Sequence, residues 1–243
     1  MAEILKNHAH NIRADQTRTK ILRAAVQEFS LHGLSGARID AIAATAGANK
    51  ALLYYYFRSK DELYAEALKS VSAKVLQDML AALDSRFSPG ERLLRSALTH
   101  FDRIFSQREF QSLMQQEMVR YRHGASMPDF FRNAFHPMLE KLLTTIDEGQ
   151  RSGELCENDP LHLLYVMLGA NVFYFLSAPI MQVALPFKPL ESRALKARRI
   201  AAVKFLGNAV FRNRTHGNKL AQRVLDDMPM PQIKNLKLRS KPL

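Results

Sequence analysis

The chain has 243 residues and a mass of 27.6 kDa, which is long enough for one large domain or two linked ones. Hydrophobic residues make up 47% of the sequence and charged residues 24%; this balance is typical of a globular protein and excludes wholesale disorder, collagen and a disulfide scaffold. The single cysteine, Cys156, excludes an intrachain disulfide and a cysteine-rich zinc site, and it fits a reducing cytoplasm.

Positive charge is concentrated at the two ends of the chain. The formal net charge is +12, and residues 191–243 alone carry thirteen lysines and arginines against three acidic residues. Residues 1–60 carry nine against four, whereas residues 61–190 are slightly acidic. This distribution indicates a polyanionic partner such as nucleic acid, although a soluble protein with a basic tail explains it equally well. The N-terminus has no apolar run of the length that a secretory signal needs, so we expect a cytoplasmic protein.

The first eighty residues predict four helices, with recognisable signals at their ends. Apolar residues recur at helical spacing, and Gly33 and Gly47 supply stops. Asn49 can cap the third helix, and Ser59 can cap the fourth, whose first turn is acidic. These helices are expected at residues 16–31, 39–46, 50–57 and 60–83.

The helical pattern continues toward the C-terminus, with glycine and proline in the breaks. Further helices are expected at residues 91–107, 109–121, 129–152, 160–178 and 191–213. The fold class is therefore all-α, with about nine helices. Beyond residue 213, prolines, lysines and arginines predict a tail, with room for one short helix at 219–226.

One stretch, from Leu163 to Met181, is long and apolar enough to span a bilayer. A helix that is apolar on all sides is equally suited to a protein core or an oligomer interface. We favour burial because the stretch contains Gly169, Asn171 and Pro179 and because nothing else in the chain approaches a span. No membrane partner is expected.

The segment from Ile39 to Leu63 carries the functional signal. Two short helices separated by a tight turn form a helix-turn-helix, in which the second helix enters the major groove of DNA. Gly47 suits the turn because it takes a positive φ without a Cβ clash. The small core between the helices is expected from Ile42, Ala43, Leu53 and Phe57.

Several residues of this region follow a known pattern. They are the lead-in helix ILRAAVQEFSLHG and the positions Ile42, Ala43, Ala46, Gly47, Leu53, Tyr54, Tyr56, Phe57, Lys60 and Leu63. Over about residues 15–75 the chain resembles TetR-type transcriptional regulators. The resemblance implies an all-α homodimer with an N-terminal DNA-binding domain and a C-terminal domain that binds a small molecule and dimerises through its last two helices. We therefore expect a flexible arm at 1–14, the DNA-binding domain at 15–75, the ligand-binding and dimerisation domain at 76–213 and a basic tail at 214–243.

Basic, polar and aromatic side chains lie where this motif meets DNA. Lys50 and Asn49 begin the recognition helix, where they can reach base edges or phosphates. Three successive tyrosines point about 100° apart and cannot all be core; we assign Tyr54 mainly to packing and the other two to DNA, an aromatic core stripe being the alternative. Residues that begin the second and fourth helices are expected to clamp phosphates. The expected DNA-binding set is Arg38, Asn49, Lys50, Ala51, Leu52, Tyr54, Tyr55, Tyr56 and Lys60.

Catalytic and cofactor signatures are absent from the sequence. The eight histidines are scattered and form no H-x-x-x-H or H-E-x-x-H pair, so a metal site is not expected. No dinucleotide-binding, Walker or G-x-S-x-G motif occurs. We therefore expect no cofactor and no enzymatic activity.

The C-terminal domain is rich in phenylalanine and methionine, which can line an apolar cavity but fill core gaps as readily. Ligand binding is expected at Met114, Glu117, Met118, Tyr121, Met167, Asn171 and Tyr174. For the dimer interface, small residues that allow close helix approach and apolar residues that provide burial are expected at Val166, Gly169, Ala170, Phe173, Ala197, Ile200, Ala201 and Phe205.

The sequence thus predicts a homodimeric, sequence-specific DNA-binding regulator, with repression favoured, that a largely apolar small molecule releases from a palindromic operator. One alternative is a nucleoid or division-site DNA-binding factor on the same fold without an inducer, and another is an unrecognised enzyme. The basic tail either adds nonspecific DNA affinity or only aids solubility.

Overall fold

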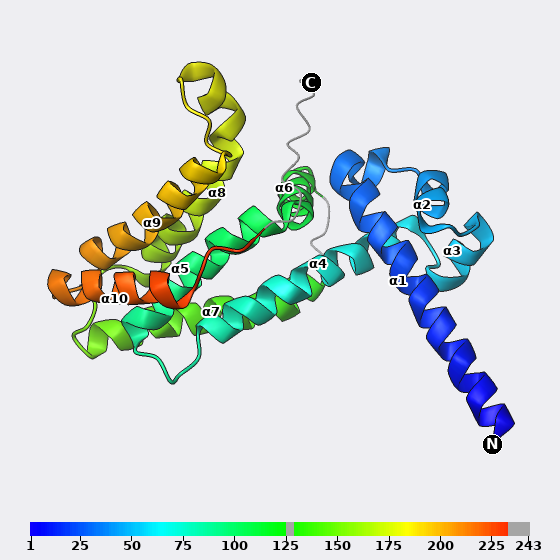
Figure 1. The fold of residues 1–243 in the computed structure, drawn as a ribbon, viewed down its shortest axis with the longest axis horizontal. Helices are drawn as coiled ribbons and strands as arrows, with labels where there is room; N and C mark the ends of the chain where they lie inside the picture. The colour runs from blue at the N-terminus through cyan, green and yellow to red at the C-terminus, as the bar shows by residue number, and fades with distance from the viewer. Residues whose placement is uncertain (125–128, 233–243) are drawn as a thin grey trace. The chain divides into compact units, whose positions relative to one another are not determined.

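The computed structural model describes residues 1–124 and 129–232, and over these ranges the chain forms ten α-helices (Figure 1). The predicted all-α class is confirmed. Two compact units divide the chain: residues 1–75 and 107–134 form unit 1, and residues 76–106 with the chain from residue 135 onward form unit 2. Two helices, α4 (Lys60–Ala82) and α7 (Asp129–Arg151), each begin in unit 1 and end in unit 2.

Unit 1 contains the two short helices of the predicted helix-turn-helix, which lie beside the long first helix (Figure 1). Its core is a single apolar cluster in which Phe29, Ile42, Leu53 and Phe57 are almost wholly buried. The helices of this unit, besides the first parts of α4 and α7, are α1 (Ala2–Gly36), α2 (Ile39–Ala46), α3 (Lys50–Tyr56) and α6 (Arg108–Arg122).

The first helix is longer than the sequence indicated. It begins at Ala2 rather than at Gln16, so the residues that were expected to form a flexible arm are helical. No glycine or proline precedes Gly33, and a chain without a breaker can continue a helix without an apolar stripe to bury. Gly33, the expected stop, takes a positive φ of 67° and kinks the helix, which then runs on to Gly36.

The sixth helix packs with the N-terminal helices, although the sequence placed it in the domain spanning 76–213. Ser112 Oγ and Gln116 Nε2 both donate to the carbonyl of Ser30, at 2.6 and 3.2 Å. Leu113 is fully buried in the unit 1 core. Sequence order could not reveal this association, because the pairing of two helices depends on matching surfaces and not on their separation in the chain.

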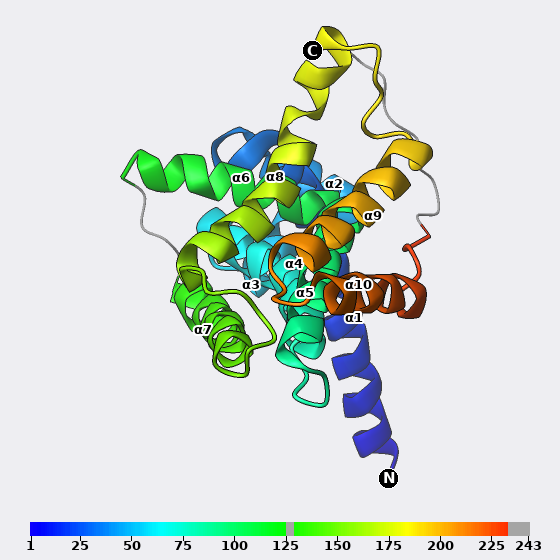
Figure 2. The same ribbon diagram turned by 90° about the vertical axis from the view of Figure 1, so that its left-hand side faces the viewer.

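Unit 2 is organised around α5 (Pro89–Ser106), which packs most extensively against three other helices of the unit. Its main apolar cluster includes Leu94, Leu98 and Ile146. Figure 2 shows this part of the chain from another side. These three helices are α8 (Pro160–Ala184), α9 (Ser192–Ala209) and α10 (Arg214–Asp227).

Helix α8 runs six residues past its predicted end. Pro179 lies inside the helix, whereas the sequence reading ended the helix just before it, at Ala178. A proline in a helix removes one backbone hydrogen bond and kinks the helix, but it does not always terminate it. Asp159, by contrast, caps the start as a helix-initiating residue should, its carboxylate accepting from the N–H of His162.

Residues 214–227 of the predicted basic tail form a helix that is longer than the short helix expected at 219–226 and that packs into unit 2. Leu220, Ala221 and Val224 are buried in the core cluster. Helices α9 and α10 approach so closely that a Cβ on Gly217 would lie 2.1 Å from the carbonyl oxygen of Gly207. The helix lacks a long apolar run, and its three core residues are spaced as one narrow stripe. Residues 233–243 of the predicted tail lie outside the described residues.

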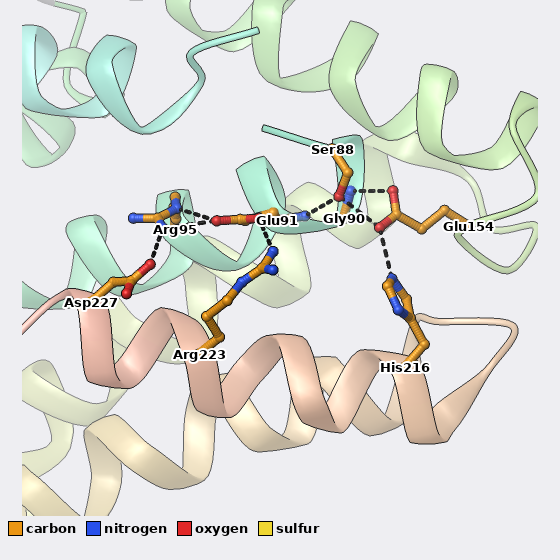
Figure 3. A network of polar contacts seen from close by, with 8 residues as sticks. All are labelled: Ser88, Gly90, Glu91, Arg95, Glu154, His216, Arg223 and Asp227. Atoms are coloured by element: carbon orange, nitrogen blue, oxygen red, sulfur yellow. Dashed lines mark hydrogen bonds and ion pairs between the residues drawn. The ribbon is translucent and has the colours of Figure 1, made fainter. Parts of the chain in front are cut away.

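Polar contacts also tie α10 to α5 (Figure 3). Arg95 pairs with Glu91 at 2.8 Å and with Asp227 at 2.6 Å, and Arg223 pairs with the same Glu91. Glu154 accepts from Gly90 N–H and Ser88 Oγ at the start of α5 and lies 3.3 Å from His216 Nε2. Arg223, one of the basic residues of the predicted tail, is therefore engaged in the fold.

Candidate nucleic-acid interface

The turn between α2 and α3 has the geometry that a helix-turn-helix requires. Gly47 adopts the left-handed conformation, with φ 64° and ψ 34°, which costs a residue without a Cβ nothing. The N–H groups of Gly47 and Ala48 donate to carbonyls at the end of α2, as in a helix C-cap. Leu53 and Phe57 bury their side chains beneath the turn, so the predicted small core is present.

Asn49 caps the N-terminus of α3. Its Oδ1 accepts from the backbone N–H of Leu52 at 2.7 Å, which is the N-cap interaction expected from the sequence. The residue itself is exposed. Its side-chain N–H₂ remains the part that can reach a base or a phosphate.

Lys50 lies beside an acidic residue that the sequence reading did not connect with it. Its Nζ is 3.3 Å from Oδ1 of Asp40 on α2, and both side chains are more than half exposed. An exposed ion pair of this kind is weak. Lys50 is therefore held near the start of α3 but can exchange its partner for a phosphate.

The three tyrosines of α3 differ in exposure. Tyr55 is 80% exposed and Tyr54 41%, whereas Tyr56 is partly buried and packs against the unit 1 core. The ring of Tyr56 meets that of Tyr55 edge to face, with centroids 5.2 Å apart. Tyr55 is thus the most solvent-exposed of the three tyrosines. Tyr54 is more exposed, and Tyr56 more buried, than the sequence suggested.

Basic residues flank the two helices. Arg38 is exposed at the start of α2, and Lys60 Nζ donates to the carbonyl of Ser35 at 3.3 Å. The sequence reading missed Arg58, an exposed arginine directly after α3; its position between the recognition helix and the Ser59 cap was the available signal. Ser59 Oγ accepts from Glu62 N–H, and the Glu62 carboxylate accepts from the N–H of Arg58, the residue before the cap. This pair of bonds is similar to a capping box and fixes the entry to α4.

A buried polar cluster connects α4 and α6 within unit 1. The hydroxyl of Tyr64 on α4 donates to Oε1 of Glu117 on α6 at 2.8 Å, and Arg120 pairs with the same carboxylate. Burial and the hydrogen bond to Glu117 raise the pKa of the Tyr64 hydroxyl, which therefore stays protonated. Glu117 was expected to bind a ligand, but in the structure its carboxylate joins α4 to α6.

The seven expected ligand residues divide between the two units. Met114, Glu117, Met118 and Tyr121 belong to α6 in unit 1, whereas Met167, Asn171 and Tyr174 belong to α8 in unit 2. Met118 and Tyr121 are exposed. Tyr174 donates its hydroxyl to the carbonyl of Pro189, and Met167 and Asn171 line one pocket together.

The residues expected at the dimer interface lie on two helices of unit 2. Val166 and Phe173 of α8 and Phe205 of α9 are each more than half exposed. Gly169, Ala170, Ala197 and Ala201 are exposed as well, and Ile200 is partly buried. A large apolar surface is thus left open on α8 and α9.

Two further features concern other classes of function. Within the described part of the chain, no group of three or more His, Cys, Asp or Glu side chains could hold a metal ion. Among the same residues, α8 alone is long and apolar enough to cross a membrane. One side of α8 lies against α5, but only 33% of its apolar window is buried.

Comparisons with known proteins agree with this geometry. A family model described as bacterial regulatory proteins, tetR family, matches residues 21–67, and one described as tetracyclin repressor-like, C-terminal domain, matches residues 89–206. The HTH-type transcriptional repressor NicS of Pseudomonas putida is 28% identical over 163 residues, which are 67% of this chain and 76% of NicS.

Two further similarities cover the motif and the fold. The HTH-type transcriptional repressor SCO4008 of Streptomyces coelicolor is 53% identical over 55 residues, 23% of this chain and 29% of that protein. The solved structure of the ketosteroid transcriptional regulator KstR2 of Mycobacterium tuberculosis shares the fold, with a TM-score of 0.61 and 20% identity over 81% of this chain and 95% of that one.

Proposed function

Because the chain belongs to the TetR family of bacterial regulatory proteins, we propose that it is a homodimeric repressor that binds a palindromic operator and is released by a small molecule. The observation that carries the proposal is the helix-turn-helix itself. Its turn has the required glycine geometry, and the exposed face of α3 presents Lys50, Tyr54 and Tyr55.

We assign the side chains of this face to two tasks. Arg38, Lys60 and Arg58 contact phosphates and hold the protein in register, while Asn49, Lys50 and the tyrosines reach base edges. Ala51 and Leu52 give α3 a narrow surface that can enter the groove. Both are short or partly packed side chains, which supports close approach of the helix to the bases.

The dimer is proposed to form through α8 and α9. Support comes from the open apolar surface of these helices, which continues past the predicted residues to Leu176, Ile180 and Val183. An exposed apolar patch of this extent is costly in water and typically marks a protein interface. The same surface supports a partner protein rather than a bilayer, since the opposite side of α8 packs on α5; we place the protein in the cytoplasm.

Induction is proposed to work by a population shift. A ligand that binds more tightly to a conformation with wrongly spaced recognition helices lowers the affinity for DNA, and DNA lowers the affinity for the ligand by the same factor. Helix α4 belongs to both units as one continuous helix. Its movement would displace Lys60 and the helix-turn-helix that precedes it.

Genome-wide mapping of bound sites, combined with transcript levels in a deletion strain, tests this function. We expect a few promoter sites that share a palindrome, with increased transcription of the adjacent genes in the deletion strain. Dispersed sites without any change in transcription would instead support the alternative, a nucleoid or division-site factor. Enzymatic turnover that survives removal of residues 1–60 would contradict the proposal that the protein is not an enzyme.

A further inference from the structure

Unit 2 contains an apolar pocket of about 240 Å³ between α5, α8 and α9. Met167 and Leu206 supply buried apolar wall, Ala97 of α5 is also buried, and Ala202 leaves space because its side chain is short. The size of the pocket suits a ligand smaller than a typical drug.

One cation, Arg198, lines this pocket without a carboxylate partner among the described residues. Its Nε–H is buried and donates to no acceptor among the described residues, while its Nη2 donates to the carbonyl of Ala170 at 3.2 Å. The guanidinium lies 5.5 Å from the centre of the Tyr174 ring. A guanidinium with a free, desolvated N–H favours an anionic acceptor, which forms a stronger hydrogen bond than a neutral one.

The other polar residues near the pocket are neutral or already paired, so its positive charge comes from Arg198. Arg199, the next residue, is paired with Asp102 at 2.8 Å and faces that carboxylate with both Nε and Nη2. Burial lowers the pKa of His100 to about 4, so this residue is neutral near pH 7. Asn171, which lines the pocket, donates to the carbonyl of Ala97 at 3.0 Å and is thereby fixed.

We propose that this pocket binds a small monocarboxylate with a short apolar body, the carboxylate on Arg198 and the hydrocarbon against Met167, Ala202 and Leu206. The inference rests on the proposed function, because it names the chemical class of the small molecule. Val166, Ala170 and Phe205 form the rest of the wall and belong to the proposed dimer face. A partner protomer would therefore close the mouth of the pocket over the ligand.

Calorimetric titration of the full-length protein with hexanoate and with hexanamide, its neutral counterpart, tests the proposal. Ionic strength is held constant because a chain with a net charge of +12 attracts anions generally. We expect hexanoate to bind at least about tenfold more tightly than hexanamide, and Arg198→Gln to remove this difference by weakening hexanoate alone. Ala202→Leu should fill the pocket and weaken both compounds.

Arg193→Gln is the matched control, because Arg193 is an exposed arginine on the same helix and does not line this pocket. It should leave both affinities unchanged. Equal binding of the two compounds to the wild type, or equal hexanoate affinity in Arg198→Gln, would overturn the proposal. Failure of hexanoate to bind a protein that is dimeric would also overturn it, and would indicate that partner side chains fill the pocket.

Operator affinity and sedimentation, measured on the same samples, separate this inference from the proposed function. If the protein dimerises and binds its operator but shows no Arg198-dependent preference for hexanoate, the ligand class alone is wrong. If hexanoate binds through Arg198 and operator affinity does not change, the ligand class stands and the proposed release mechanism fails.

Discussion

The Lys50 ammonium can pair with Asp40 in the free protein or with a phosphate or base of bound DNA. Lys50→Ala should weaken operator binding by about 1–3 kcal/mol if it reads a base. If the contact is to a phosphate, the loss should be similar on all sequences, and the slope of log affinity against log salt should fall by about 0.9. Fluorescence anisotropy on operator and unrelated DNA at several salt concentrations measures both.

Lys69→Ala provides the control for this measurement. Lys69 is exposed and pairs with Glu66 on α4 at 3.6 Å, so its removal deletes an ion pair of the same kind outside the recognition helix. Its operator affinity should match that of the wild type. Unchanged affinity and salt slope in Lys50→Ala would show that this residue serves only to hold Asp40.

His100 gives the protein a defined loss of stability in acid. Burial lowers the pKa of His100 from 6.5 to about 4. Between these two pH values the His100 imidazole is protonated in the unfolded chain but neutral in the folded chain. The contribution of His100 is therefore complete above pH 6.5 and declines as pH falls toward 4. Between pH 7.5 and 5 this amounts to about 2 kcal/mol of unfolding free energy.

Urea unfolding at a series of pH values measures this linkage. His100→Gln should lower stability at pH 7.5, because it alters a buried site beside Asn171, yet lose less stability than the wild type on going to pH 5. Parallel pH profiles for the two proteins would contradict the assignment to His100.

At the scale of elements, the packing of α10 against α9 predicts that the C-terminal region contributes to the stability of unit 2. Gly217→Ala adds a Cβ that meets the carbonyl oxygen of Gly207 and the ring of Phe211 within 3 Å. The two helices must then separate, and forced overpacking of this kind costs about 1–3 kcal/mol. Thermal unfolding should show the loss, since Leu220 and Val224 would be pulled from the core.

Lys219→Ala is the matched variant on the same helix. Lys219 is exposed, and replacing an exposed residue usually changes stability by less than about 0.5 kcal/mol. Removal of residues 214–243 should destabilise unit 2 strongly, whereas removal of residues 233–243 leaves α10 in place. A solubility or DNA-binding role of the tail is therefore tested with the shorter deletion, by its salt slope on DNA.

At the scale of the whole molecule, dimerisation governs recognition of the operator. Two recognition helices are expected to meet successive major grooves about 34 Å apart, or a small multiple of this, on a palindromic site. Ala201→Asp places a charge in the proposed interface of α8 and α9, where an unpaired carboxylate is costly to bury. We expect monomers in sedimentation and an operator affinity at least tenfold lower.

Ala73→Asp serves as the comparison, because Ala73 is exposed on α4 and outside the proposed interface. It should remain a dimer with normal affinity. A dimer of unchanged stability in Ala201→Asp would refute this interface, and a half-site footprint for the wild type would refute paired recognition.

The helix-turn-helix was predictable from the sequence because its determinants are local. Gly47 is needed for a left-handed turn, Asn49 and Ser59 are capping residues, and Leu53 and Phe57 are apolar at the spacing of one helix face. Each of these follows from backbone sterics or from the first turn of a helix, within a few residues. The sequence by itself thus determined the all-α class and the DNA-binding motif.

Tertiary structure decided what the distant segments do. Glu117 became a partner of Tyr64, and α10 became part of the core through a contact between Gly207 and Gly217. Arg198 lines an apolar pocket, whereas the neighbouring Arg199 forms an ion pair with Asp102. A carboxylate or a glycine looks the same in a sequence whether it faces solvent, a ligand or another helix. Its role depends on which surfaces meet, and that is set by packing over many residues.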